Sequence, residues 1–317
     1  MRSMPNPEAI TQAARLLREL ALVAFPTETV YGLGADARSD KAVLKIFQAK
    51  GRPRFNPLIV HIGSLAAAKR LGRFDIRAGA LAQAFWPGPL TLVVPMRTDA
   101  GLSDLVTAGL DTVALRVPGH KTAQRLLSEA DMPVAAPSAN VSGTVSPTRA
   151  DHVAGAFGNQ IAMILDAGPT DCGLESTIVS VAPGEPLRCL RPGSVTRAEL
   201  AATTGETVAD AEPGKISSPG QLRRHYAPAV ALRLNAATAG PGEALIAFGP
   251  PPPGHKPFVN LSPAGDLGEA AAGLFAALRA LDDAGIARAA VMPIPDAGLG
   301  EAINDRLSRA SAPMDAT

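Results

Sequence analysis

Cationic side chains are gathered in a short loop near residue 50. Lys50, Arg52 and Arg54 stand at every second position, and Pro53 and Pro57 keep the segment from continuing as a helix. Ammonium and guanidinium groups on such a loop can hold a phosphate or a carboxylate. A solvated surface loop carries the same residue types, so the charges by themselves leave both interpretations open.

A turn rich in hydroxyl groups precedes that loop, and it contains Thr27, Glu28, Thr29 and Tyr31. Gly32 and Gly34 follow, and each would permit a close approach that a Cβ blocks, although ordinary turn glycines look the same. No Gly-Lys-Ser/Thr sequence follows them, so the stretch is not a Walker A phosphate loop.

Two further polar features lie later in the chain. Arg116 belongs to an alternating strand, TVALRVP at 112–118, and an arginine among apolar neighbours needs a partner or a cleft. Residues 137–148, PSANVSGTVSPT, follow a short apolar strand, where open α/β sheets bind ligands. Such residues also form ordinary turns and caps, and a strand-end arginine can simply face solvent.

The elements that would position these groups alternate between strand and helix. We expect a helix over 7–20, strands over 20–25 and 58–62, a helix capped by Asp40 and a helix capped by Ser64. Residues 201–220 are small, polar and rich in Gly and Pro, as in a linker. Strands and helices alternate again from residue 229. We therefore expect a first domain over 1–203, a linker over 204–228 and a smaller C-terminal α/β domain over 229–317.

Composition limits the class of protein. The 317 residues are 46% hydrophobic with a net charge of +1, so the chain is neither disordered nor globally basic. Residues 1–203 hold 21 Lys and Arg against 17 Asp and Glu, a charge of +4 that suits small anions better than a nucleic-acid track. Cys172 and Cys189 lack metal-ligand spacing, which favours free thiols in a reducing compartment. No signal pattern or membrane-length apolar run is present, so we expect a cytoplasmic protein without membrane association.

Six strings of this sequence occur in order and resemble the Sua5/YrdC family of threonylcarbamoyl-AMP synthases. They are PTETVYGLGADA, KGRPRFNPLIVH, TVALRVP, PSANVSG with SPT, ESTIVSV and LRPG. The later SPG and HYAP strings and the α/β tail resemble the two-domain Sua5 form. This resemblance implies an open twisted YrdC-like sheet with a deep basic pocket, followed by a Rossmann-like Sua5 domain.

The resemblance also implies a reaction: L-threonine, bicarbonate or CO2, and ATP give threonylcarbamoyl-AMP and pyrophosphate, for the t6A37 modification of tRNA. Mg²⁺ would accompany ATP, without dedicated protein ligands. Positions matching those that hold L-threonine are Thr29, His61, Arg116, Ser138 and Thr177. Positions matching those that hold ATP are Arg52, Asn56, Thr112, Asn140, Thr148 and Arg191, and Lys50 with Arg52 forms the basic motif assigned to catalysis. Further partners could include the tRNA threonylcarbamoyltransferase machinery, in transient contact, and RNA, in weak contact.

The linker departs from the family pattern, because Gln221, Leu222 and Arg223 stand where relatives often have Met, a basic residue and Tyr. The following His225-Tyr226 pair is intact, and we expect 218–228 to fold over the pocket with one of these two residues reaching the nucleotide. Two alternative functions remain. A double-stranded RNA-binding module would use the basic face as a cradle, but +4 offers few phosphate contacts. Hydrogenase-maturation proteins share a related domain, but their paired C-x2-C motifs are missing here.

Overall fold

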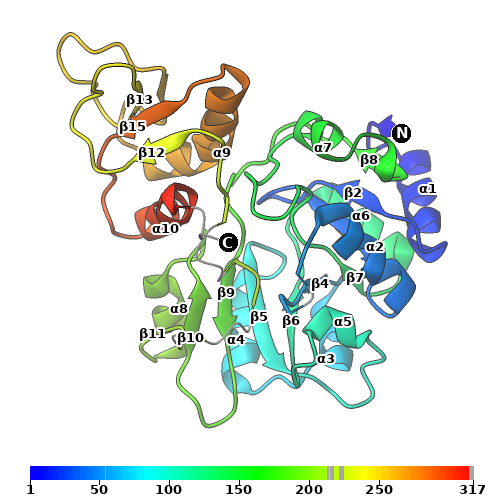
Figure 1. Ribbon diagram of the computed structural model, residues 1–317. Helices are drawn as coiled ribbons and strands as arrows, with labels where there is room; N and C mark the ends of the chain where they lie inside the picture. Colours follow the sequence, from blue (N-terminus) through cyan, green and yellow to red (C-terminus); the bar gives the residue numbers. More distant parts are fainter. Residues whose placement is uncertain (54, 213, 215–217, 221–224, 314–317) are drawn as a thin grey trace.

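The computed structural model describes residues 1–53, 55–212, 214, 218–220 and 225–313 (Figure 1). Arg54, Arg223 and Arg224, which the sequence places beside the expected pocket, lie outside these residues. The described chain forms a large mixed sheet with helices against it and a smaller parallel sheet with two long helices.

Eleven strands of the described chain form the large sheet, in the order β1-β8-β2-β3-β7-β4-β6-β5-β9-β10-β11. Their bounds are β1 Arg2–Ser3, β2 Val23–Phe25, β3 Gly32–Asp36, β4 Ile59–His61, β5 Leu90–Pro95, β6 Thr112–Arg116, β7 Val134–Ala135, β8 Met163–Leu165, β9 Thr177–Ser180, β10 Arg188–Arg191 and β11 Ala209–Asp210. The central strands β4 and β6 are parallel, with His61 opposite Arg116. The expected linker thus contributes an edge strand, β11, which pairs with β10.

Helices cover this sheet unequally. Their bounds are α1 Pro7–Arg18, α2 Asp40–Lys50, α3 Leu65–Leu71, α4 Ile76–Phe85, α5 Asp104–Thr107, α6 Lys121–Ala130, α7 Ala150–Phe157 and α8 Arg197–Thr204, with a 3-10 turn at Gly158–Gln160. One face carries a single large core that extends from α2 to α8. On the other face α1 and α6 cover only the half around β2, β7 and β8.

The remaining half of that second face is a strip of apolar side chains. It consists of Ile59, Val93, Ala114, Ile178 and Leu190, one from each of five neighbouring strands. Of the described residues packed against this strip, Ala211 comes from the segment after β11. A sheet face without a helix over it is where a ligand can lie on the strands.

The smaller domain is a four-stranded parallel sheet in the described residues, in the order β12-β15-β13-β14. Its strands are β12 Ala231–Arg233, β13 Ala244–Ala247, β14 Val259–Asn260 and β15 Arg288–Val291, and its helices are α9 Leu267–Asp283 and α10 Leu299–Ser311. The alternation of strands and helices expected after residue 229 is confirmed. Among the described helices, none is long and apolar enough to cross a membrane.

Local sequence explains the start of α2, with one correction. Ser39, not Asp40, is the N-cap, because the Ser39 side chain accepts a hydrogen bond from the backbone N–H of Ala42. Asp40 is the first helical residue instead, where its charge favours the positive end of the helix dipole. Ser64 caps α3 as predicted.

Gly34 allows the close backbone approach that the sequence predicted. It lies within strand β3, not in the turn before that strand. A Cβ at Gly34 would lie 2.8 Å from the Phe25 ring. Such a contact would push the neighbouring strand β2 away.

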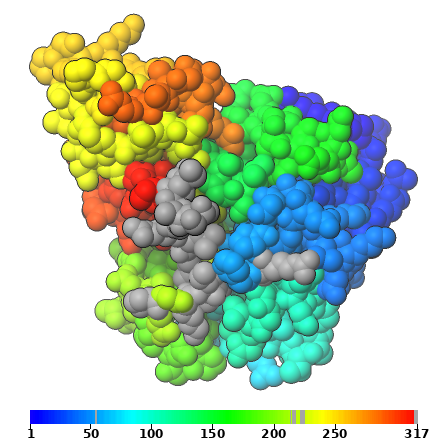
Figure 2. All heavy atoms as spheres, viewed as in Figure 1, coloured from blue at the N-terminus to red at the C-terminus, as the bar shows by residue number. Residues whose placement is uncertain are grey.

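The two domains share a core. Val30, Val145 and Leu174 of the first domain belong to the same buried cluster as Phe275 and Leu278 of α9. Gly173 touches α9 so closely that a Cβ there would lie 2.5 Å from the carbonyl oxygen of Ala271. Figure 2 shows the yellow-to-red atoms of the C-terminal domain packed directly against green ones of the first. The C-terminal domain therefore rests on the loops that precede β9 and α7.

Candidate functional site

Polar side chains converge where β4 and β6 end, beside the apolar strip. Seven of the residues singled out from the sequence line one cavity there: Thr29, Arg52, His61, Arg116, Ser138, Arg191 and His225. The cavity is small, about 40 Å³, and Pro219 and Gly220 of the linker also line it. Three arginines around one cavity form an anion-binding arrangement.

Arg116 is held in place by groups of the hydroxyl-rich turn. Its Nη2 donates to Glu28 Oε1 at 2.7 Å, its Nη1 to Thr29 Oγ1 at 3.0 Å, and its Nε to the carbonyl of Gly88 at 3.3 Å. Burial would raise the pKa of Glu28, but the Arg116 cation outweighs it and the pKa lies below its usual value. Arg116 is therefore an oriented cation with a permanent carboxylate partner.

His61 lies beside Arg116 on the adjacent strand as a neutral imidazole. Burial, with the positive charge of Arg116, lowers its pKa to about 3. Its Nδ1 is buried and has no hydrogen-bond partner in the described structure. A buried ring nitrogen without a partner is a position that a bound ligand can satisfy.

Lys50 ends α2 and is almost completely buried. Its amine donates to the carbonyl oxygens of Ser138 at 2.6 Å and Asn140 at 2.5 Å. Burial lowers the pKa of Lys50 well below its usual value, and the Arg52 charge adds to this shift while Glu175 opposes it. The Lys50 amine thus connects α2 to residues 137–148, the polar loop.

Arg52 and Asn56 belong to the same turn. Arg52 Nη2 donates to the Pro57 carbonyl at 2.9 Å and Nε to the Asn56 carbonyl at 3.3 Å. Burial lowers the pKa of Arg52 to about 10. Neither side-chain polar atom of Asn56 finds a partner in the described chain, although both are buried. The interpretation of this loop as solvated surface is wrong for Lys50 and Arg52.

Arg191 approaches the cavity from β10. It donates from Nε to the Ser176 carbonyl at 3.1 Å and from Nη2 to Ser176 Oγ at 3.2 Å. Ser176 Oγ also lies 2.8 Å from Thr91 Oγ1. Ser176 lines the cavity, whereas the Thr177 hydroxyl bonds to the backbone of Val195. The structure therefore does not bring the Thr177 side chain to the cavity, because successive side chains of a strand point to opposite faces.

Glu175 also lines the cavity, and the sequence interpretation gave it no role. Its Oε2 accepts from Arg306 Nε of α10 at 2.9 Å, and its Oε1 accepts from the Ser146 hydroxyl. Burial would raise the pKa of Glu175, but the charges of Arg306 and Arg191 outweigh it and lower the pKa. Arg306 is fully buried and also donates to Asp305 at 2.7 Å.

The His225-Tyr226 pair has one member at the cavity. His225 lines the cavity, and burial lowers its pKa to about 3. The Tyr226 ring packs against the C-terminal domain, 5.6 Å from the Phe275 ring and 5.1 Å from the Arg306 guanidinium, while its hydroxyl lies beside Gly220 and Arg191. Tyr226 also holds a backbone φ of 60°, which is unusual for a residue with a side chain.

Five other residues from the sequence interpretation do not line this cavity: Lys50, Asn56, Thr112, Asn140 and Thr148. The Asn140 amide donates to the carbonyls of Val141 and Thr144, although its Oδ1 is buried without a partner in the described residues. Thr148 is buried behind the polar loop, with its backbone N–H donating to His152. Thr112 lies at the other end of β6 and lines a second hollow of about 340 Å³ with Leu190 and Arg188.

That second hollow lies on the same sheet face as the cavity. Successive side chains of β6 point to opposite faces, so every second residue, Thr112, Ala114 and Arg116, points to the same one. At a rise near 3.3 Å per residue, these three positions span about 13 Å. The apolar strip lies between the two hollows. The two hollows and the buried strip thus lie in a row along one sheet face, a path with cations at one end and apolar side chains at its centre.

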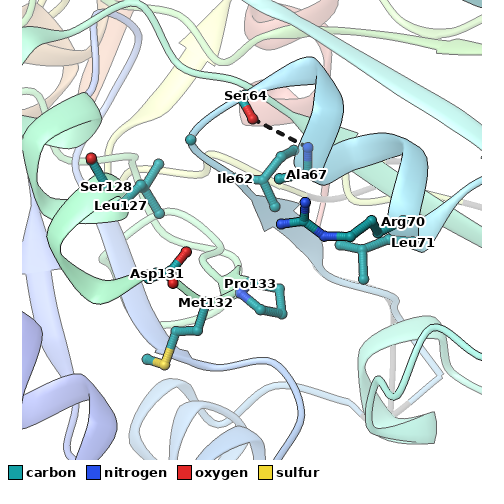
Figure 3. A pocket seen from close by; sticks show the side chains of 11 residues that line it. Ile62, Ser64, Ala67, Arg70, Leu71, Leu127, Ser128, Asp131, Met132 and Pro133 are labelled. Atoms are coloured by element: carbon teal, nitrogen blue, oxygen red, sulfur yellow. Dashed lines mark hydrogen bonds between the residues drawn. The ribbon is translucent and has the colours of Figure 1, made fainter.

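Another hollow lies on the opposite face of β4. Figure 3 shows it between α3 and the end of α6, with Ile62, Arg70 and Asp131 around it; its volume is about 260 Å³. It contains none of the residues proposed from the sequence to bind substrate. Among the described residues, no group of three or more His, Cys, Asp and Glu side chains could hold a metal ion.

Both parts of the chain match known families. Residues 15–193 match the family model Sua5–YciO–YrdC, described as "Telomere recombination", and residues 195–312 match the one described as "Threonylcarbamoyl-AMP synthase, C-terminal domain". The threonylcarbamoyl-AMP synthase of Bacillus subtilis is 43% identical, covering 96% of this chain and 94% of that protein. The Pyrococcus abyssi enzyme of the same name is 41% identical, covering 94% and 93%.

Solved structures agree with the sequence comparison. Pyrococcus abyssi Sua5 complexed with L-threonine superposes with a TM-score of 0.88 at 37% identity, covering 98% of this chain and 96% of that one. A variant of the same protein, in which a neighbouring His and Tyr are replaced by Ala, gives 0.86 at 37% identity, covering 95% and 92%. The likeness extends over both domains.

Proposed function

Because the chain belongs to the Sua5/YrdC family of threonylcarbamoyl-AMP synthases and has both domains of the two-domain form, we propose that it joins L-threonine, bicarbonate or CO2, and ATP into threonylcarbamoyl-AMP. Its nucleotidyltransferase class follows from the near-full-length match. Pyrophosphate is the second product, and the adenylate is the donor for t6A37 in tRNA. The two free thiols fit a cytoplasmic site of action.

One observation carries this proposal: oriented cations and buried, unpartnered polar atoms converge on one cavity. Arg52, Arg116 and Arg191 supply the charge. His61 and His225 also line it, and the Nδ1 atom of each is buried without a partner in the described structure. Burying polar atoms unpaired is costly, so their convergence marks a ligand position.

L-threonine fits the Arg116 end of the cavity. Arg116 is suited to a bidentate grip on the amino-acid carboxylate, since Glu28 and Thr29 already fix its plane. The neutral His61 and the Ser138 and Thr29 hydroxyls can orient the threonine hydroxyl and amine without adding charge. The Pyrococcus abyssi relative is known with L-threonine bound. Ser176 replaces Thr177 in this proposal as the side chain that faces the substrate.

ATP fits the path from Arg52 and Arg191 over the apolar strip towards Thr112. The triphosphate would lie among the arginines, close to Lys50 and His225, and the flat adenine would lie on the strip around Ala114. Asn140 and Thr148 would contribute indirectly, by fixing the position of the polar loop beside the nucleotide. Tyr226 would hold His225 in place from behind.

The reaction needs no protein nucleophile. The threonine amine takes up CO2 to give a carbamate and a proton, and a carbamate oxygen attacks the α-phosphorus of ATP as pyrophosphate leaves. Holding the two reactants in line and compensating the charge on pyrophosphate are the protein's tasks. Lys50, Arg52 and Arg191 are placed for the second task. Mg²⁺ enters with ATP as part of the substrate and needs no protein carboxylate.

The deciding experiment is pyrophosphate release by the purified protein. Release from ATP should require both L-threonine and bicarbonate, and omission of either should reduce it to background. An RNA-binding module would show no such dependence, and its binding to duplex RNA would weaken steeply with salt. The small charge of the first domain favours the enzyme.

A further inference from the structure

The C-terminal domain places one charged side chain directly behind the cavity. Arg306 of α10 is fully buried, and its Nε donates to Glu175 Oε2, 131 positions away in the chain. Glu175 lines the cavity. The second domain therefore completes the wall of the first domain's site with an ion pair.

Glu175 lies among cations that the nucleotide would need. Its negative charge acts on the pKa of both Lys50 and Arg191, so these groups are within electrostatic reach of it. Each of its two oxygens is already engaged, one by Arg306 and the other by the Ser146 hydroxyl. Within the described structure, no hydrogen bond joins this carboxylate to Lys50, Arg52 or Arg191, which donate to other acceptors.

We propose that Arg306 is a positioning residue for ATP: it retains the Glu175 carboxylate and so keeps it from pairing with Lys50, Arg52 and Arg191. A buried carboxylate that loses its partner seeks another cation. The nearest ones would be those that bind phosphate, and pairing with them would compete with ATP. This inference rests on the proposed function only in taking ATP as the anion that these cations bind.

Other charges around Arg306 agree with such a retaining role. Asp305 accepts from both Arg306 and Arg309, so the helix supplies a second carboxylate that keeps Arg306 fixed. The Tyr226 ring lies 5.1 Å from the guanidinium and covers it from the linker side. Arg306 is thus held from three sides. The Arg306–Glu175 ion pair could move as a whole only if α10 left the first domain.

The test compares ATP binding in four full-length proteins. Arg306→Met removes the cation at similar volume, and we expect ATP affinity, measured calorimetrically with a non-hydrolysable analogue, to fall at least tenfold. L-threonine affinity should change less than threefold, because Arg116 keeps its own carboxylate partner, Glu28. Arg306→Met combined with Glu175→Gln should recover most of the lost ATP affinity. Arg233→Met breaks a surface ion pair with Glu243 in the same domain and is the control.

Each outcome decides the inference. Equal loss of ATP affinity in the single and double variants would overturn it, because Arg306 would then act only by supporting the fold. Unchanged ATP affinity in Arg306→Met would overturn it as well. If Arg306→Met does not fold, Arg306→Gln replaces it, because its amide still donates to Glu175 without the charge, and the same recovery by Glu175→Gln is expected. Absence of ATP binding in the unaltered protein would instead refute the proposed function.

Discussion

Arg116 donates to Glu28 across 2.7 Å at the inner end of the cavity, and the side chains of both residues are largely buried. The pair explains how an arginine can stand among apolar strand residues. It also means that the substrate carboxylate would join an existing network that fixes the guanidinium plane beforehand. Such preorganisation reduces the entropy lost on binding.

Arg116→Ala should weaken L-threonine binding far more than ATP binding. Loss of a charge-assisted bidentate contact costs about 2–4 kcal/mol. Calorimetric titration with each substrate measures the two effects separately. Arg97→Ala, which removes a surface pair with Asp99, is the matched control. Equal weakening of both ligands would show that Arg116 supports the fold and does not select threonine.

Lys50→Ala and Arg52→Ala should abolish pyrophosphate release. Both variants should also lower the melting temperature, because Lys50 donates to the carbonyls of Ser138 and Asn140, and Arg52 to those of Asn56 and Pro57. Either loss leaves two carbonyls short of a donor, at about 1–3 kcal/mol. Near-normal turnover in both variants would contradict the role given to this pair.

The linker prediction concerns closure of the site. ATP with L-threonine should protect residues 218–228 from proteolysis, and His225→Ala should lower turnover while leaving L-threonine affinity unchanged. His225 at the cavity and Tyr226 against Phe275 are the contacts that support this expectation. Cleavage in the surface loop around 250–256 serves as the internal control. Equal cleavage rates of 218–228 with and without ligands would show that the segment only connects the two domains and does not close the site.

Stability should fall in mild acid because of two buried histidines. His61 and His225 have pKa values of about 3 in the folded protein, against about 6.5 when unfolded. Below pH 6.5 the unfolded state therefore binds more protons, so the free energy of unfolding decreases as the pH falls from about 6.5 towards 4. Each group contributes up to about 1.4 kcal/mol per pH unit. Urea unfolding at several pH values measures the slope, and His61→Gln should reduce it.

Gly173→Ala should disturb the domain interface. The residue has φ of +70°, and its Cβ would lie 2.5 Å from the Ala271 carbonyl of α9. Gly184→Ala is the matched control, since it has φ of +76° with open space around it. The control should lose about 1 kcal/mol of stability from backbone strain alone. Gly173→Ala should lose clearly more in thermal unfolding, and an equal loss would show that α9 shifts without cost.

Seven residues chosen from sequence patterns line one cavity in the structure, for a physical reason. Alternation along β6 marked Arg116 as an arginine facing inwards, and the prolines around Arg52 marked a loop at the end of a helix. At β9 the motif pointed to Thr177, whereas the structure places Ser176 at the cavity, because neighbouring side chains of an extended segment face opposite ways.

Arg306 and Glu28 show where sequence reasoning stops. An arginine in an amphipathic helix ordinarily faces solvent, and only the docking of α10 onto the loop before β9 buries Arg306. Glu28 stood in the hydroxyl-rich turn, but its partner lies 88 positions away. Contacts of this kind depend on the packing of distant elements, which local periodicity does not encode. The apolar residues around Arg116 in its strand nevertheless indicated that its cation needs a partner or a cleft.

The small cavity under Pro219 and Gly220 also has a consequence for association rates. At about 40 Å³ the cavity is far smaller than a nucleoside triphosphate, so ATP binding in the proposed position would need an opening step first. In rapid mixing, the observed rate of nucleotide capture should therefore rise with concentration and then level off at the opening rate. Threonine captured before closure would be trapped until the adenylate forms, and exchange of labelled threonine would slow when ATP is present.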